Sequence, residues 1–163
     1  MLRSESGVSA VEFALVSPLL FVLTLGIIEF GLLLFDKAVI TNASREGARA
    51  AIVRTELPDG NNNSVYSPLS VPEIQSVVSA YANDYLINLG VAGDDNLSAD
   101  DIAVTYFDVD GSEIASPVIG GRVEVRVDFL YDFLVLPNLV RLLGDEGFSG
   151  NVNLVGTTVM RME

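Results

Sequence analysis

The chain of 163 residues contains no cysteine, no histidine and no tryptophan. Without cysteine there is no disulfide, no thiolate nucleophile and no cysteine-based metal site. Without histidine the chain lacks the commonest general base and metal ligand, so it cannot build a Ser-His-Asp or Cys-His centre alone. We therefore expect a non-enzymatic protein with no cofactor and no metal site. Of the three interpretations considered in this section, a hydrolase is the least favoured, and it would have to work with paired carboxylates.

Positive charge is also scarce, with 9 Lys and Arg against 22 Asp and Glu and a net charge of −13. Nearly all of the excess acid lies after residue 55. Such a surface repels phosphate backbones, so we expect no nucleic-acid partner.

Residues 13 to 35 form a dense block of Leu, Ile, Val and Phe. As a helix this block would be about 34 Å long, enough to cross a hydrocarbon core of about 30 Å. It is too long for a cleaved secretory signal, and Asp36-Lys37 closes it in place of a small-residue cleavage site. We predict a leader over residues 1–7, a transmembrane helix over 8–36 and an extracytoplasmic domain over 37–163.

Two carboxylates interrupt the apolar block: Glu12 near its start and Glu29 well inside it. A charge near the bilayer centre costs about 2.5 to 3.5 kcal/mol on insertion scales. Either both groups lie near interfaces or are protonated, or each is satisfied by a neighbouring subunit when the helices pack together. Gly26 and Gly31 would permit a close approach beside Glu29.

Pro18 also lies within this block. Proline cannot donate to the carbonyl four residues earlier, and its ring clashes with that turn. We therefore expect a kink or a locally melted turn at Pro18.

The segment Gly7-Val8-Ser9-Ala10-Val11-Glu12-Phe13, followed by the apolar run to Phe35, resembles a TadE-like protein. This family comprises pseudopilins or minor pilins of the Tad (tight adherence, Flp) pilus system. Pro18, Glu29-Phe30-Gly31 and the run from Ala43 to Ala51 look like the usual continuation, and residues 157–163 resemble the common family ending. The strong resemblance covers residues 7–53.

The resemblance implies that a prepilin peptidase cuts between Gly7 and Val8. Glu12 would then be the fifth residue of the mature chain, followed by Phe13, and would pair with the free amine of Val8 in a neighbouring subunit. The implied partners are the peptidase, other pilin or pseudopilin subunits, Tad inner-membrane assembly proteins and membrane lipid. The implied location is the bacterial inner membrane, and the implied role is pilus assembly and surface adherence. Whether the subunit enters the pilus or only primes its assembly is left open.

The remaining sequence predicts a small α+β domain. The anchor helix should continue over 37–55, an exposed loop should follow over 56–64, and a capping box at Ser70 and Glu73 should open a second helix that stops near Gly90. In this second helix Ile74, Val77, Val78, Tyr81 and Tyr85 share one face. Strand-like segments cover 102–109, 123–129 and 151–161. We predict a pilin-like fold in which a small antiparallel sheet packs on the long helix.

Each of two further segments can be explained in two ways. The apolar stretch from Leu134 to Leu143 is either a core segment or short helix, or a contact with lipid or another subunit. Asp108 to Glu113 lacks the full spacing of a calcium loop and is better explained as a hairpin turn. The alternative to a pilin-like function is a single-pass extracytoplasmic binding or sensor module with an uncleaved anchor, in which the acidic loops form the active surface.

Overall fold

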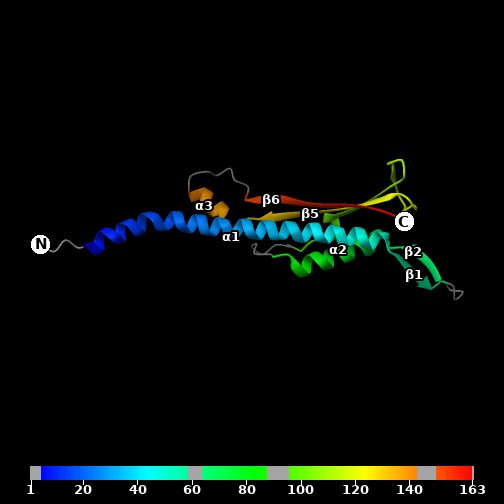
Figure 1. Cartoon of the computed structure of the whole chain (residues 1–163), viewed down its shortest axis with the longest axis horizontal. Helices are drawn as coiled ribbons and strands as arrows, with labels where there is room; N and C mark the ends of the chain where they lie inside the picture. Colours follow the sequence, from blue (N-terminus) through cyan, green and yellow to red (C-terminus); the bar gives the residue numbers. More distant parts are fainter. Residues whose placement is uncertain (1–4, 59–63, 88–95, 143–149, 163) are drawn as a thin grey trace.

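One long helix, α1 (Glu5–Ile52), runs through most of the molecule (Figure 1). The computed structural model describes residues 5–58, 64–87, 96–142 and 150–162. At 48 residues α1 is about 72 Å long. Its amino-terminal part extends alone, and the remaining elements gather around its carboxyl-terminal part.

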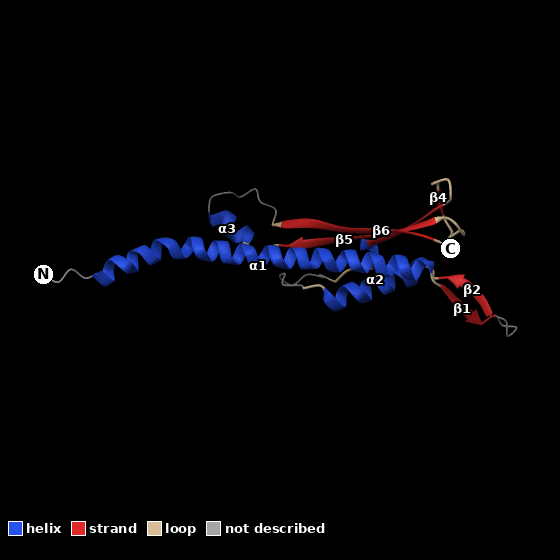
Figure 2. Ribbon diagram, in the orientation of Figure 1, coloured by secondary structure: helices blue, strands red, loops and turns tan. Residues whose placement is uncertain are grey.

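A four-stranded antiparallel sheet packs along α1, with strand order β4-β3-β5-β6 (Figure 2). The strands are β3 (Ile102–Phe107), β4 (Glu113–Ile114), β5 (Arg122–Asp132) and β6 (Asn151–Arg161). Burial alternates along β5, so that Val123, Val125 and Val127 are fully buried while the residues between them face outward. This alternation is typical of a sheet with one face on the core and one in water.

The core lies between α1, the sheet and α2 (Val71–Tyr85). Helix α1 packs against β5 and β6, and α2 packs against α1 and β3. Ile40 of α1, Ile74 and Val78 of α2 and Val125 of β5 are all fully buried. The structure is therefore an α+β fold, as the sequence predicts.

Smaller elements complete the described chain. They are β1 (Arg54–Pro58), β2 (Ser64–Pro68), the short 3-10 helix η1 (Ala99–Asp101) and α3 (Leu136–Leu142). Strands β1 and β2 pair as a separate two-stranded sheet. Figure 1 shows this hairpin beyond the carboxyl-terminal end of α1.

Several boundaries differ from the sequence predictions. The loop expected over 56–64 is shorter, because β1 and β2 occupy both of its ends; residues 59–63 lie outside the described residues. Helix α2 buries Ile74, Val78 and Ala82, whereas Tyr85 is exposed. It ends at Tyr85, and Gly90, the predicted stop, lies outside the described residues. The long helix ends at Ile52, three residues before the predicted position.

Candidate assembly site on the long helix

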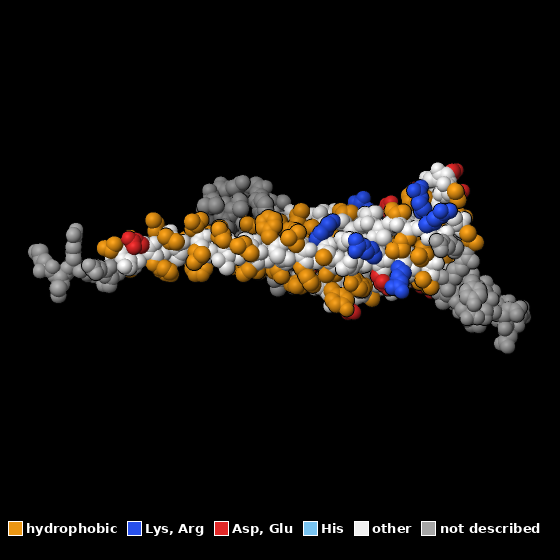
Figure 3. Space-filling model, viewed as in Figure 1, with side chains coloured by type: hydrophobic (Ala, Val, Ile, Leu, Met, Phe, Trp, Pro, Cys, Tyr) orange, Lys and Arg blue, Asp and Glu red, His pale blue; other side chains and the backbone are white. Residues whose placement is uncertain are grey.

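Residues 7–28 of α1, here called the bare segment, are hardly covered by the other described residues. From residue 7 to residue 28 every position is exposed except Ser17 and Gly26, which are half-buried. Hydrophobic side chains cover this part of the helix, and the Lys and Arg visible in Figure 3 lie over the other half of the molecule. The helix is long and apolar enough to cross a membrane. These 22 residues correspond to about 33 Å of helix, close to the thickness of a hydrocarbon core.

Gly7, Val8, Glu12 and Phe13 all lie on this bare segment and are all exposed. Positions 8 and 12 are four residues apart, so they share one face of the helix. Within the described part of the chain, no hydrogen bond or ion pair holds the Glu12 carboxylate. Glu12 is therefore a carboxylate on an apolar helix with no partner among the described residues of its own chain.

Glu29 has the opposite environment, because it is only 3% exposed. Its Oε1 accepts a hydrogen bond from the backbone N–H of Val135 at 2.9 Å, and its Oε2 accepts one from Leu136 N–H at 3.0 Å. The Tyr131 hydroxyl donates to the Glu29 carbonyl at 3.4 Å. The carboxylate thus satisfies two amides at the start of α3, where a negative charge is favourable.

From the sequence, Glu29 either lies near an interface or is protonated, or it is satisfied by a neighbouring subunit. The structure gives it a third kind of partner, the backbone at the start of α3 more than a hundred residues further along its own chain. The predicted site residues therefore separate into two groups. Glu29 is engaged inside the molecule, whereas Glu12 faces outward.

A second buried carboxylate, Asp36, was read from the sequence only as the end of the apolar block. It is fully buried, and its Oδ1 accepts a hydrogen bond from Ile87 N–H at 3.0 Å. Its Oδ2 has no hydrogen-bond partner among the described residues. Nearby, Lys37 Nζ donates to the carbonyl of Val155 in β6. Burial raises the pKa of the Tyr131 phenol, and the charges of Glu29 and Asp36 raise this pKa further.

Helix α1 continues through Pro18 without a melted turn. Figure 1 shows its amino-terminal part curving away from the straighter remainder, and a kink caused by Pro18 itself stays a prediction. A Cβ added at Gly26 or at Gly31 would meet nothing within 4 Å. Both glycines are therefore free to lie against another molecule.

The two segments left open by the sequence are now placed. In the stretch from Leu134 to Leu143, residues 134–142 are described and contain the short helix α3, whereas Leu143 lies outside the described residues; the exposed fraction of Leu134 is 47%. The acidic segment from Asp108 is a turn between β3 and β4, in which Ser112 N–H and Oγ donate to Asp110 Oδ1 at 2.9 and 2.7 Å. Among the residues that the structure describes, no group of three acidic side chains is arranged to hold a metal.

Residues 7–49 match the model of a family described as TadE-like protein. The match begins at Gly7 and ends within α1, so it includes Val8, Glu12, Phe13, Pro18 and Glu29. No curated protein and no solved structure matches the chain. The resemblance to the TadE-like family is therefore confirmed over this segment, and the apolar helix and the family together fit a membrane protein related to the Tad pilus.

Proposed function

We propose that this chain is a membrane-anchored TadE-like pseudopilin or minor pilin that acts in Tad pilus assembly and surface adherence. A prepilin peptidase cuts it after Gly7, and the mature chain begins at Val8. The leader faces the cytoplasm, since Arg3 and the amino terminus carry positive charge there. The sheet domain then lies outside the cytoplasm.

The observation that carries this proposal is the contrast between the two carboxylates of α1. Glu29 is occupied by amides of its own chain, whereas Glu12 has no partner among the described residues and lies on the bare helix. Removal of the leader creates a new amine at Val8. A carboxylate and an ammonium in an apolar bundle must be paired, because an isolated charge there is strongly disfavoured. The Val8 amine of a neighbouring subunit supplies that partner for Glu12.

Cleavage is tested by the intact mass and amino-terminal sequence of the protein purified from membranes of its own host. We expect the wild-type chain to begin at Val8 and a Gly7→Glu chain to keep its leader. Gly26→Ala is the matched control, because a methyl group at that open position meets nothing within 4 Å and leaves cleavage unchanged. A wild-type chain that begins at Met1 would overturn the proposal and favour an uncleaved anchor with a binding or sensor domain.

The role of Glu12 is tested separately from cleavage. Glu12→Gln keeps the shape of the side chain and removes its charge, so we expect a chain that is processed normally but is lost from pilus assembly. Glu12→Asp keeps the charge and should restore part of the assembly. Normal piliation and adherence with Glu12→Gln would show that this carboxylate is not the assembly contact.

A further inference from the structure

One end of the sheet domain is fixed at the level where the bare segment stops. Glu29 is the residue directly after the bare segment, and its carboxylate accepts hydrogen bonds from the backbone N–H groups of Val135 and Leu136. The hydroxyl of Tyr131, near the end of β5, donates to the carbonyl of Glu29. The end of β5 and the start of α3 are therefore held beside the first domain-covered residue of α1.

Helix α3 lies on the side of the sheet that is nearer to the bare segment. Figure 2 shows α3 beyond the ends of β5 and β6, in the direction of the amino-terminal part of α1. The opposite end of β5 is distant, because ten residue steps separate Arg122 from Asp132, about 33 Å of strand. Helix α3 and the adjoining ends of β5 and β6, here called the proximal end, are thus the part of the domain closest to the candidate membrane span.

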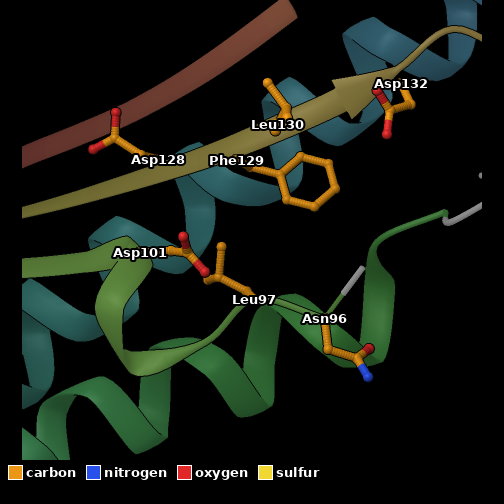
Figure 4. A pocket seen from close by; sticks show the side chains of 7 residues that line it. All are labelled: Asn96, Leu97, Asp101, Asp128, Phe129, Leu130 and Asp132. Atoms are coloured by element: carbon orange, nitrogen blue, oxygen red, sulfur yellow. The ribbon is translucent and has the colours of Figure 1, made fainter. Parts of the chain in front are cut away.

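Large hydrophobic side chains are exposed at the proximal end. The exposed fraction is 57% for Leu130, 47% for Leu134 and 36% for Val152. Val152 is paired in register with Tyr131, so it lies at the same level of the sheet. Figure 4 shows Leu130 on the opposite side of β5 from Phe129, which is buried. Exposed leucine and valine next to an apolar helix favour contact with an apolar surface that is continuous with the one around that helix.

The charged side chains of the proximal end limit how deeply it can lie in a bilayer. Asp132 and Arg141 are both exposed, and Arg141 is the one charged residue among the seven of α3. A carboxylate in the hydrocarbon core is strongly disfavoured, whereas it stays hydrated in the headgroup layer. The methylenes of an arginine can lie along apolar surface while its guanidinium reaches a lipid phosphate. The combination fits the interfacial layer and not the hydrocarbon core.

A cavity of about 170 Å³ beside Leu130 indicates which headgroup suits this end (Figure 4). Its lining contains three aspartates, Asp101, Asp128 and Asp132, and no basic residue. Negative charge there repels an anionic headgroup. A zwitterionic phospholipid is therefore the fitting neighbour.

We propose that the proximal end rests in the interfacial layer of the bilayer that α1 crosses, where zwitterionic phospholipid covers Leu130 and Leu134. The same lipid surface surrounds the bare segment, so the contact is continuous with the anchor. This inference rests on the proposed function only in that α1 is a membrane anchor. It requires neither cleavage after Gly7 nor a pilus, and a chain that keeps its leader makes the same contact. Its failure is therefore distinguishable from failure of the proposed processing.

The absence of cysteine allows a fluorophore to be attached at one chosen position. Leu134→Cys labels the proximal end, and Val109→Cys labels an exposed position in the turn at the other end of the sheet. Full-length chains are reconstituted at low density in phosphatidylcholine vesicles that contain nitroxide-labelled phosphatidylcholine. We expect nitroxides near the headgroup to quench the label at residue 134 strongly and the label at residue 109 hardly at all. Phe21→Cys, in the bare segment, should be quenched best by nitroxides deep in the acyl chains.

Iodide in the surrounding water distinguishes a lipid cover from the alternatives. We expect the label at residue 134 to be shielded from iodide relative to the label at residue 109. If iodide reached residue 134 and nitroxide lipid did not quench it, water would cover the proximal end. If residue 134 were shielded from both quenchers, protein would cover it. Either result would overturn the proposal.

An added charge tests the apolar contact itself. With the label at Leu130→Cys, the further change Leu134→Asp should remove most of the quenching by headgroup nitroxides, because a second carboxylate moves the proximal end toward water. Val159→Asp is the matched control, since Val159 is also exposed on the sheet but is paired with Glu124 near the distant end. Circular dichroism of both variants shows that they are folded. Quenching at residue 130 that survives Leu134→Asp would refute the proposal.

Discussion

Gly47 is the residue of α1 whose small size is most clearly required. A Cβ at this position would lie 2.3 Å from Val78 Cγ2 of α2 and 3.2 Å from Val125 Cγ1 of β5. The sequence identifies Gly47 only as a weak helix former between arginines, because the side chains that press on it lie far along the chain. Its physical role is to let α2 and the sheet approach α1 closely.

We predict that Gly47→Ala lowers the free energy of unfolding by about 1–3 kcal/mol, the usual cost of overpacking a filled core. This loss should exceed the gain of up to about 1 kcal/mol that alanine brings to a helix interior. Denaturant unfolding of the full chain in detergent, followed by circular dichroism, measures the difference. Gly31→Ala is the control, because nothing lies within 4 Å of that position. An unchanged stability of Gly47→Ala would contradict the packing of α2 on α1.

Among the elements, α3 depends most directly on a distant side chain. Its first amides are satisfied by the Glu29 carboxylate, which comes from a different helix. A hydrogen bond to a charged group contributes about 1.5–3 kcal/mol. Removal of this carboxylate should therefore loosen α3 while leaving the sheet, whose buried valines lie elsewhere, intact.

We predict that Glu29→Ala accelerates amide hydrogen exchange at Val135 and Leu136 by about 10- to 100-fold, as expected for the loss of 1.5–3 kcal/mol. Exchange measured by NMR in detergent also reports Val123 and Val125 of β5, which should stay protected. Glu12→Gln serves as the comparison, since it changes a carboxylate of the same helix that does not touch α3. If Glu29→Ala left exchange at both amides unchanged, Glu29 would not support α3.

The elements that could be predicted from sequence are those whose signal is local. The alternation of Val123 to Phe129 identifies β5, and the capping box of Ser70 and Glu73 places the start of α2, where Ser70 N–H donates to Glu73 Oε2 at 2.8 Å. Strands β1 and β2 were missed because turn-forming residues dominate the segment between them. The partner of Glu29 could not be predicted, because it depends on folding Val135 back onto α1.

The candidate site, like the fold, could be predicted only where its signal is local in the sequence. The spacing from Gly7 to Glu12 and the apolar run are sequence signals, and the family match covers them. The difference between Glu12 and Glu29 is not a sequence signal, since both are isolated acids in an apolar helix. In the structure, Glu29 is buried and contacted by Tyr131, Val135 and Leu136, whereas Glu12 is exposed.

At the scale of the whole molecule, α1 divides into a bare half and a half that carries the domain. The sequence places the end of the membrane span at residue 36, where the apolar block ends. Among the residues that the structure describes, the domain first buries a side chain of α1 at Glu29, and Asp36 is fully buried. Because folded protein occupies one face of α1 from Glu29 onward, we predict that the membrane span ends near residue 28, earlier than residue 36.

A water-soluble maleimide applied to single-cysteine variants in sealed vesicles distinguishes the two boundaries. The exposed fraction of Phe35 is 45%, so Phe35→Cys should react if the span ends near Glu29. Ser17→Cys, in the middle of the bare segment, should be protected, and Asn42→Cys, on an exposed position beside the domain, should react. If Phe35→Cys were protected as strongly as Ser17→Cys, the membrane span would end at residue 36. In that case Glu29 and the start of α3 would lie within the bilayer, where the two hydrogen bonds that Glu29 accepts would satisfy its carboxylate without water.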